Sequence, residues 1–205
     1  MDKDNQDIDK LKQEFIANAS HELKTPVTSI QLAVETAISA LENSEIEDAK
    51  RFMNQILKDS QRMTLLLSDL LDLSQLEVNN PEKELVILNS IIDAEIGFLS
   101  NENKNRVVFE SEDIEFLIDP NDFSMIIRNL LRNACNYSEL DKEINIKLFK
   151  DELNVVLSVV DKGRSRSLGG TGIGLSIVKH AVERNGGVIE LISQFGEGSE
   201  FKVIF

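Results

Sequence analysis

The chain has 205 residues, 41% of them hydrophobic and 28% charged, which is typical of a folded, water-soluble protein. Its net charge of −14 argues against binding to nucleic acid or to an anionic membrane surface, because both need a surplus of Lys and Arg. Cys135 is the single cysteine, so an intrachain disulfide is excluded and a reducing cytoplasm fits. The sequence shows neither a signal peptide nor an apolar run long enough to span a bilayer.

Glycine usage divides the chain near Asn79-Asn80-Pro81. All 10 Gly residues follow this point, and none precedes it. Long helical patterns come before it, and shorter alternating segments come after it. We therefore predict two domains, residues 1–79 and residues 80–205.

The first domain is predicted to be a helical hairpin. Apolar residues recur at three- and four-residue steps from about residue 7 to 41 and again from 52 to 73, with a break at residues 42–44. Asp59 interrupts the second pattern. Two helices cannot bury both apolar seams alone, so we predict a homodimeric four-helix bundle. A monomeric hairpin folded onto the second domain is the alternative.

The second domain is predicted to be an α/β sandwich, a mixed sheet with helices on one face. The predicted helices are residues 91–99, 120–135 and 171–184, and a strand is predicted at residues 85–88. Three pairs of strands are predicted to be neighbours in sequence and in space. These pairs are residues 106–110 with 114–118, residues 144–149 with 153–160, and residues 188–193 with 200–205.

His21 breaks the pattern of the first helix. At about 100° per residue it lies roughly 160° from the apolar seam, so we predict that it faces solvent, with Thr25 one turn further on the same face. Pro26 deprives the carbonyl of Glu22 of its helical hydrogen bond, which predicts a kink, and such departures tend to mark function. By itself, an exposed His on a helix is usually only a surface residue.

Residues 15–27, FIANASHELKTPV, are similar, nearly position by position, to the phosphoacceptor segment of sensor histidine kinases. The resemblance implies that His21 takes a phosphoryl group from ATP and passes it to an aspartate in the receiver domain of a response regulator. It implies that Glu22 accepts the imidazole proton and that Thr25 positions water when the regulator is dephosphorylated. It also implies that the chain is the cytoplasmic part of a membrane-anchored sensor.

The predicted helix at residues 120–135 carries Asn129 and Asn133 on one face, with Asn136 a turn further on. A carboxamide oxygen suits Mg²⁺, although a polar solvent face would look the same. Residues 129–134, 159–163 and 170–175 resemble the N box and the two glycine boxes of the same kinases. The resemblance implies an ATP-binding domain of the GHKL (Bergerat) type, and it covers the chain from residue 15 to residue 205.

The resemblance also assigns ATP and Mg²⁺ to particular residues. Asn133 would bind Mg²⁺, and Asp161 would accept a hydrogen bond from the adenine amino group. The glycines would let backbone N–H groups approach the phosphates at a helix N-terminus. The residues assigned to the nucleotide are Asn129, Asn133, Asn136, Tyr137, Asp161, Gly163, Gly170, Thr171, Gly172, Gly174 and Leu175.

Two features depart from the family pattern. Asn136 stands where Lys is usual, and only six residues separate Gly163 from Gly170 where the family has a long lid over the nucleotide. Either the lid has been deleted or a mobile segment is left out of the sequence.

The predicted function is that of a kinase core, and the alternative is a lid-shortened, kinase-impaired dimeric phosphatase or docking module. A third possibility is another ATPase of the sandwich superfamily. The helical His segment argues against it, because those relatives lack such a segment.

Overall fold

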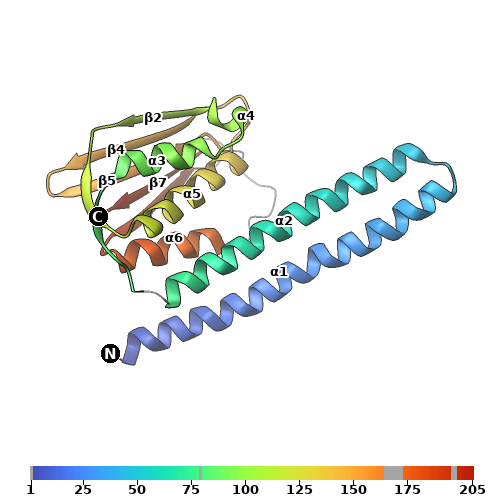
Figure 1. Cartoon of the computed structure of the whole chain (residues 1–205), viewed down its shortest axis with the longest axis horizontal. Coiled ribbons are helices and arrows are strands. Elements are labelled where there is room, and N and C mark those ends of the chain that lie inside the picture. Colours follow the sequence, from blue (N-terminus) through green and yellow to red (C-terminus); the bar gives the residue numbers. More distant parts are fainter. Residues whose placement is uncertain (1, 79, 164–172, 195–197) are drawn as a thin grey trace. The chain divides into compact units, whose positions relative to one another are not determined.

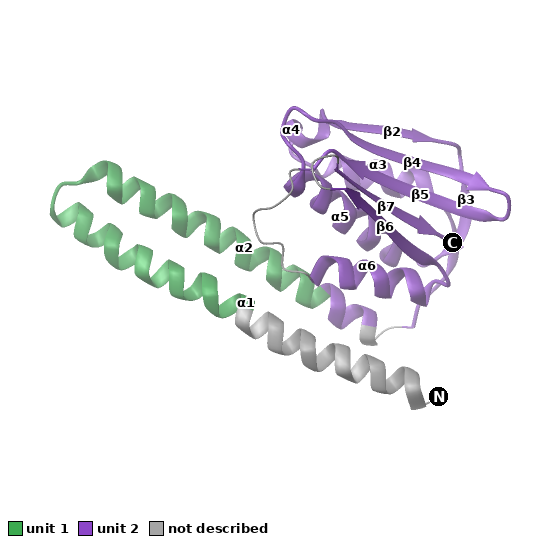
Figure 2. Cartoon of the chain, turned by 180° about the vertical axis from the view of Figure 1, so that it is seen from behind, with its two compact units in different colours: residues 1–71 green, residues 72–205 purple. Residues whose placement is uncertain are grey.

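A computed structural model describes residues 2–78, 80–163, 173–194 and 198–205, with the backbone alone for residues 2–21, 77 and 78. The chain forms two compact units, Met1–Leu71 and Asp72–Phe205 (Figure 2). The division falls seven residues before the end of the second helix, and the domain boundary at residue 79 stays a prediction. Within the described residues, no helix is long and apolar enough to cross a membrane.

The first unit is the predicted helical hairpin, made of α1 (Asp2–Glu42) and the first part of α2 (Ile46–Val78). The turn between them contains Ser44, whose positive φ of 63° lets the chain reverse within three residues. The helix α1 continues through Pro26, which is buried. Both helices are confirmed at the predicted positions.

Small side chains lie where the two helices meet. Ala33, Ala37 and Ala40 of α1 are buried at successive turns, together with Ala49 and Leu66 of α2. Because Ala projects only a methyl group, the two backbones can approach closely along this seam. The hairpin is therefore held by a narrow apolar seam that leaves other apolar side chains outside.

The second unit contains a mixed five-stranded sheet with the strand order β2-β4-β5-β7-β6. Its strands are β2 (Val107–Ser111), β4 (Ile144–Asp151), β5 (Asn154–Asp161), β6 (Val188–Gln194) and β7 (Gly198–Ile204). The strands β2 and β4 run parallel, and the other neighbours are antiparallel. A separate antiparallel pair joins β1 (Glu84–Ile87) to β3 (Glu115–Ile118).

Three helices cover one face of this sheet, as Figures 1 and 2 show: α3 (Leu88–Gly97), α5 (Pro120–Tyr137) and α6 (Ile173–Arg184). The side chain of Asp119 caps α5 by accepting from the backbone N–H groups of Asn121 and Asp122, and Pro120 is its first residue. Apolar side chains of α5 are buried in the core of this unit: Phe123, Ile126, Ile127, Leu130 and Ala134. The predicted α/β sandwich is confirmed.

One predicted strand pairing is wrong, and one short helix was not predicted. Residues 107–111 and 115–118 do not pair with each other, because β2 joins β4 and β3 joins β1. The parallel pairing of β2 with β4 needs a crossover connection between the two strands, and the local sequence does not indicate such a pairing. The short helix α4 (Asn101–Lys104), which the side chain of Ser100 caps, was not predicted.

Candidate functional site

The phosphoacceptor segment lies on α1. His21 is within this helix, but its side chain is outside the described residues, so its solvent-facing position stays a prediction. Glu22 is half-buried and Thr25 is exposed. The two side chains next to His21 that carry predicted roles are therefore both at or near the surface of the hairpin.

Glu22 has a partner that sequence analysis missed. The Nη2 atom of Arg62 on α2 donates to Oε2 of Glu22 over 2.8 Å, with both side chains about one-third exposed. The hairpin register could have suggested this pair, because Glu22 and Arg62 lie at similar distances from the turn at Asn43 and Ser44, to within about one helical turn. The contact joins the predicted proton acceptor to the opposite helix.

A second polar contact crosses the hairpin two turns away. Ser29 donates its hydroxyl to Oδ2 of Asp59 over 2.6 Å, and Gln55 donates to the same oxygen over 3.0 Å. This contact explains why Asp59 interrupts the apolar pattern of α2. Beside it lies an open groove of about 500 Å³, lined by Lys24, Thr25, Thr28, Ser29 and Leu32.

Asn129 lies inside the second unit. It is buried, it donates to the carbonyl of Met125 over 2.9 Å, and its Oδ1 accepts from Nη2 of Arg132 over 2.6 Å. A Cβ atom on Gly174 would come within 2.9 Å of that Oδ1 and 3.0 Å of Arg132 Nη2. The start of α6 therefore packs directly on Asn129 and Arg132, and a larger residue at position 174 would have to displace their side chains. Arg132 was not among the predicted site residues, and it brings a cation beside the second glycine box.

The remaining predicted residues of α5 lie nearer to solvent. Asn133 and Tyr137 are half-buried, and Asn136 is exposed. Among the described side chains, no three His, Cys, Asp or Glu residues are grouped as a metal site. Asn133 and Asn136 offer carboxamide oxygens to a metal ion at this end of α5.

Asp161 is the most unusual residue of the second unit. It ends β5, it is only 3% exposed, and its Oδ1 is buried without a hydrogen-bond partner in the described part of the chain. Burial raises the pKa of this carboxyl to about 6, against a smaller lowering by the backbone N–H of Ser199. A buried acceptor without a donor is rare in folded proteins and indicates a place for a ligand that donates.

Two glycines make room around Asp161. A Cβ on Gly163 would lie 2.8 Å from Asp161 Oδ1, and one on Gly198, whose φ is +126°, would lie 2.0 Å from the Asp161 carbonyl oxygen. Gly163 also pairs with Ser138 in an isolated bridge, and its Cβ position is 3.4 Å from the carbonyl oxygen of Tyr137. The structure thus brings the end of α5, the end of β5 and the first glycine box together.

Part of the predicted site cannot be placed. Gly170, Thr171 and Gly172 lie outside the described residues. Leu175, in the first turn of α6, is 37% exposed.

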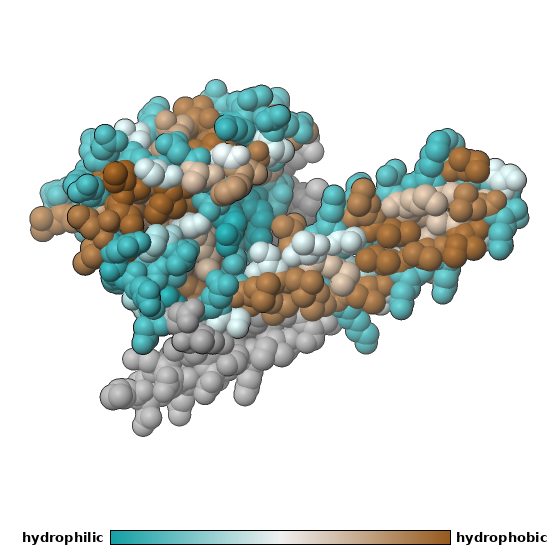
Figure 3. Space-filling view, in the orientation of Figure 1, coloured by the Kyte–Doolittle hydropathy of each residue, from teal (hydrophilic) through white to brown (hydrophobic). Residues whose placement is uncertain are grey.

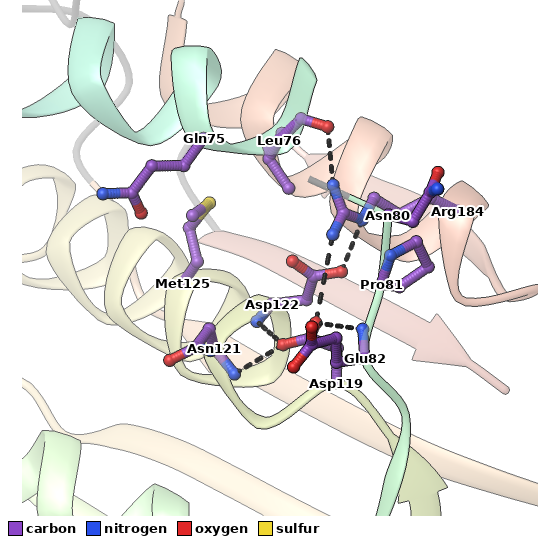
Figure 4. A pocket seen from close by; sticks show the side chains of 10 residues that line it. All are labelled: Gln75, Leu76, Asn80, Pro81, Glu82, Asp119, Asn121, Asp122, Met125 and Arg184. Atoms are coloured by element: carbon purple, nitrogen blue, oxygen red, sulfur yellow. Dashed lines mark hydrogen bonds and ion pairs between the residues drawn. The ribbon is translucent and has the colours of Figure 1, made fainter. Parts of the chain in front are cut away.

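A second polar cluster lies at the opposite ends of α5 and α6 (Figure 4). Arg184 forms an ion pair with Asp122 over 2.7 Å and donates to the carbonyl of Leu76 over 2.6 Å, and the backbone N–H of Glu82 donates to Asp119 over 2.8 Å. Burial raises the pKa of Asp122, although Asn185 and Arg184 act to lower it. This cluster borders a cavity of about 530 Å³ and anchors the segment that follows α2. Its carboxylates are engaged by protein groups, which indicates a structural role.

Two parts of the chain each match a known protein family. Residues 11–79 match the family described as His Kinase A (phospho-acceptor) domain, and residues 118–205 match the Histidine kinase-, DNA gyrase B-, and HSP90-like ATPase family. The sensor-like histidine kinase SenX3 of Mycolicibacterium smegmatis is 28% identical over 227 residues, covering 95% of this chain and 57% of that protein. The sensor protein kinase WalK of Staphylococcus saprophyticus is 30% identical over 225 residues, covering 95% of this chain and 36% of that protein.

The fold is shared with solved structures. The Acinetobacter baumannii histidine kinase AdeS matches with a TM-score of 0.67 at 22% identity, over 90% of this chain and 96% of that chain. The chain spans less than two thirds of the two relatives above. The fold of each unit agrees with the family that its residues match. The chain therefore belongs to the sensor histidine kinases, with a phospho-acceptor domain followed by an ATPase domain of the GHKL type.

Proposed function

We propose that this chain is a catalytic core that transfers the γ-phosphoryl group of ATP to His21 and then to an aspartate of a response regulator. The observation that carries the nucleotide half of this proposal is Asp161, whose buried Oδ1 accepts no hydrogen bond within the described residues. The exocyclic amino group of adenine can donate to that oxygen, whereas the keto oxygen of guanine cannot. Asp161 therefore selects an adenine nucleotide.

The phosphates would lie toward the start of α6. By resemblance, the backbone of Gly170, Thr171 and Gly172 approaches them, and Gly174 keeps the first turn of α6 close to Asn129. Mg²⁺ usually keeps several waters and binds few protein groups besides substrate phosphates, which suits the half-buried carboxamide of Asn133. When bound, Mg²⁺ supplies charge neutralisation at the phosphates. Arg132 brings a cation to the same end of α5, where Asn136 lacks the usual Lys.

His21 and Glu22 would carry the transfer. A ring nitrogen of His21 uses its lone pair to bond the γ-phosphorus while the bond from phosphorus to the ADP oxygen breaks, and that oxygen keeps the electron pair. The proton on the other ring nitrogen passes to the Glu22 carboxylate. Thr25, exposed one turn further along α1, would hold water for hydrolysis of the regulator's aspartyl phosphate.

A homodimer fits the hairpin. Apolar side chains that the hairpin leaves exposed recur along both helices, and Figure 3 shows them gathered on its surface. Those with a regular spacing are Val27, Val34, Ile38 and Leu41 on α1 and Ile46, Met53, Leu57, Leu67 and Leu71 on α2, while Leu32 and Leu65 are exposed outside this spacing. The spacing is close to a heptad repeat, which is the pattern that a second hairpin would cover in a four-helix bundle.

The kinase reaction is tested by labelling. Incubation of the chain with labelled ATP and Mg²⁺ is expected to give an acid-labile, base-stable phosphoryl group, and His21→Gln is expected to abolish it. The matched control is His180→Gln, which replaces the only other His of the chain and should label normally. Equal labelling of His21→Gln and the parent chain would rule out His21 as the acceptor.

A second function is favoured by the short segment between the glycine boxes. The alignments with SenX3 and WalK run over 227 and 225 positions, more than the 205 residues of this chain, so these relatives carry residues that it lacks. With an incomplete lid, the chain would act as a dimeric phosphatase or docking module. In that case it would not label itself but would accept phosphate at His21 from a lid-intact relative.

Thr25→Ala separates the two activities. Because Ala is the better helix former, the variant should fold normally and keep transfer to His21, while losing most dephosphorylation of a phosphorylated regulator. Glu22→Gln should show the opposite pattern, since an amide is not a base. Both rates are measured for each variant, and equal losses of both activities in both variants would contradict the division of roles.

A further inference from the structure

Glu22 is a poor proton acceptor if its side chain is unrestrained. A Glu side chain has three rotatable bonds and samples many rotamers on an exposed helix surface. A general base must instead stay within hydrogen-bond reach of the proton that it removes. Something has to hold the carboxylate, and α1 itself offers no such contact among the described residues.

Arg62 makes that contact from α2. Its Nη2 donates to Oε2 of Glu22 over 2.8 Å, whereas its Nε is buried and makes no hydrogen bond within the described part of the chain. The pair is therefore a one-point contact and not the two-point fork that Arg often forms with a carboxylate. The arrangement occupies Oε2 of Glu22, and Oε1 accepts no hydrogen bond from the side chains that the structure describes.

The pair contributes little to folding. The side chains of Arg62 and Glu22 are 38% and 33% exposed, and ion pairs so open to water add little stability. The hairpin already has a buried apolar seam and the Ser29–Asp59 hydrogen bond. Arg62 therefore matters more for the position of the Glu22 carboxylate than for the stability of the hairpin.

We propose that Arg62 is a positioning residue for phosphorylation of His21, an inference that rests on the proposed role of Glu22. Arg62 fixes Oε2, and Oε1 receives the proton that leaves one ring nitrogen of His21. At the same time the other ring nitrogen bonds phosphorus, and the bond from phosphorus to the leaving group breaks. Arg62 itself touches neither the imidazole nor the nucleotide in this scheme.

Three variants of the full chain test the proposal. Arg62→Gln removes the cation, and Arg62→Lys keeps it. Arg51→Gln is the matched control on the same helix, where Arg51 is exposed, pairs with Asp48 and lies over the ring of Phe52. Arg62→Gln should slow single-turnover phosphorylation of His21 about 10- to 100-fold, because misplacing a general base costs that much. The KM for ATP should not change, since other residues hold the nucleotide. Arg62→Lys should stay within about threefold of the parent, because a one-point contact needs only a single charged donor.

The same variants are also phosphorylated with phosphoramidate, a donor that needs no ATP site. Here the bond from phosphorus to the donor nitrogen breaks, ammonia leaves, and the ring proton again passes to Glu22. A parent chain that fails to label with ATP counts against the proposed kinase reaction alone, and the phosphoramidate rates then decide the role of Arg62. An Arg62→Gln rate equal to the parent rate with both donors, or an equal loss in Arg62→Lys and Arg62→Gln, would overturn the inference.

Discussion

A charged Asp161 carboxylate would favour the proposed binding of adenine, but the same buried charge lowers the stability of the folded chain. Burial raises the pKa of its carboxyl from 3.8 to about 6. Between these values the folded chain binds a proton that the unfolded chain has released, so the free energy of unfolding falls as the pH rises through this window. At neutral pH the buried charge costs the nucleotide-free protein at most about 3 kcal/mol.

Replacing this carboxylate should therefore have two opposite effects. Asp161→Asn should raise the free energy of unfolding at pH 7 and flatten its decline between about pH 4 and 6, because the uncompensated charge is gone. The same change should weaken ATP binding roughly 10- to 100-fold, since a hydrogen bond to a charged acceptor is lost. Urea unfolding from pH 4 to 8 and calorimetric titration with ATP measure the two effects.

The control for this prediction is Asp151→Asn, at an exposed position at the end of β4. It should leave both the pH dependence and the affinity for ATP unchanged. If Asp161→Asn is destabilised and binds ATP as tightly as the parent chain, then Asp161 is a structural residue and adenine is recognised elsewhere.

At the scale of helices and strands, the sequence predicted what is local. The helices α1, α2, α5 and α6 follow from apolar periodicity and from the cap and Pro at the start of α5, and the β4–β5 and β6–β7 hairpins follow from short polar turns. The parallel partner of β2 could not be predicted, because a crossover pairing leaves no local mark.

The candidate site was also predicted only in part. Motifs indicated Asp161, Asn129 and the glycines, but not the contacts that these residues make. The ion pair from Arg62 to Glu22 joins two helices and depends on where the chain reverses, so the sequence did not reveal it. The hydrogen bond from Arg132 to Asn129 lies within α5, and its three-residue spacing could have suggested it. The roles of all these residues in catalysis stay predictions.

The polar cluster at the end of α6 gives a prediction about elements. The Arg184 side chain is 12% exposed and lies against the carboxylates of Asp122 and Asp119 and the carbonyl of Leu76. Arg184→Met keeps the length of the side chain but leaves two buried carboxylates without a cation, which should cost about 3–5 kcal/mol. The midpoint of urea unfolding measures the loss.

Lys179→Met is the control on the same helix. Lys179 and its partner Glu183 are mostly exposed, 3.7 Å apart, so their loss should change stability by no more than about 0.5 kcal/mol. If both variants lose the same small amount, the cluster does not anchor the segment between α2 and the sheet.

For the molecule as a whole, the hairpin has more apolar surface than one chain can bury. Ala33, Ala37 and Ala40 face inward on α1, while Val34 and Ile38 stay 38% and 53% exposed on another side of the same helix. One helix with two separate apolar stripes is typical of a four-helix bundle, where each helix contacts two neighbours. In the homodimer that we propose, a second copy of the chain would supply the two missing helices.

Ile38→Glu should therefore convert a dimer into a monomer, because it would place a charge inside the seam between hairpins with no partner there. Light scattering coupled to size exclusion at micromolar concentration measures the mass. Leu153→Glu is the control, since Leu153 lies in the β4–β5 turn and is 98% exposed, and its mass should match that of the parent dimer. A parent chain that is monomeric at this concentration would remove the case for a dimer, and an Ile38→Glu variant that stays dimeric would place the interface on another face of the hairpin. Loss of the dimer in Ile38→Glu with normal ATP binding would also show that the second unit binds nucleotide without a partner chain.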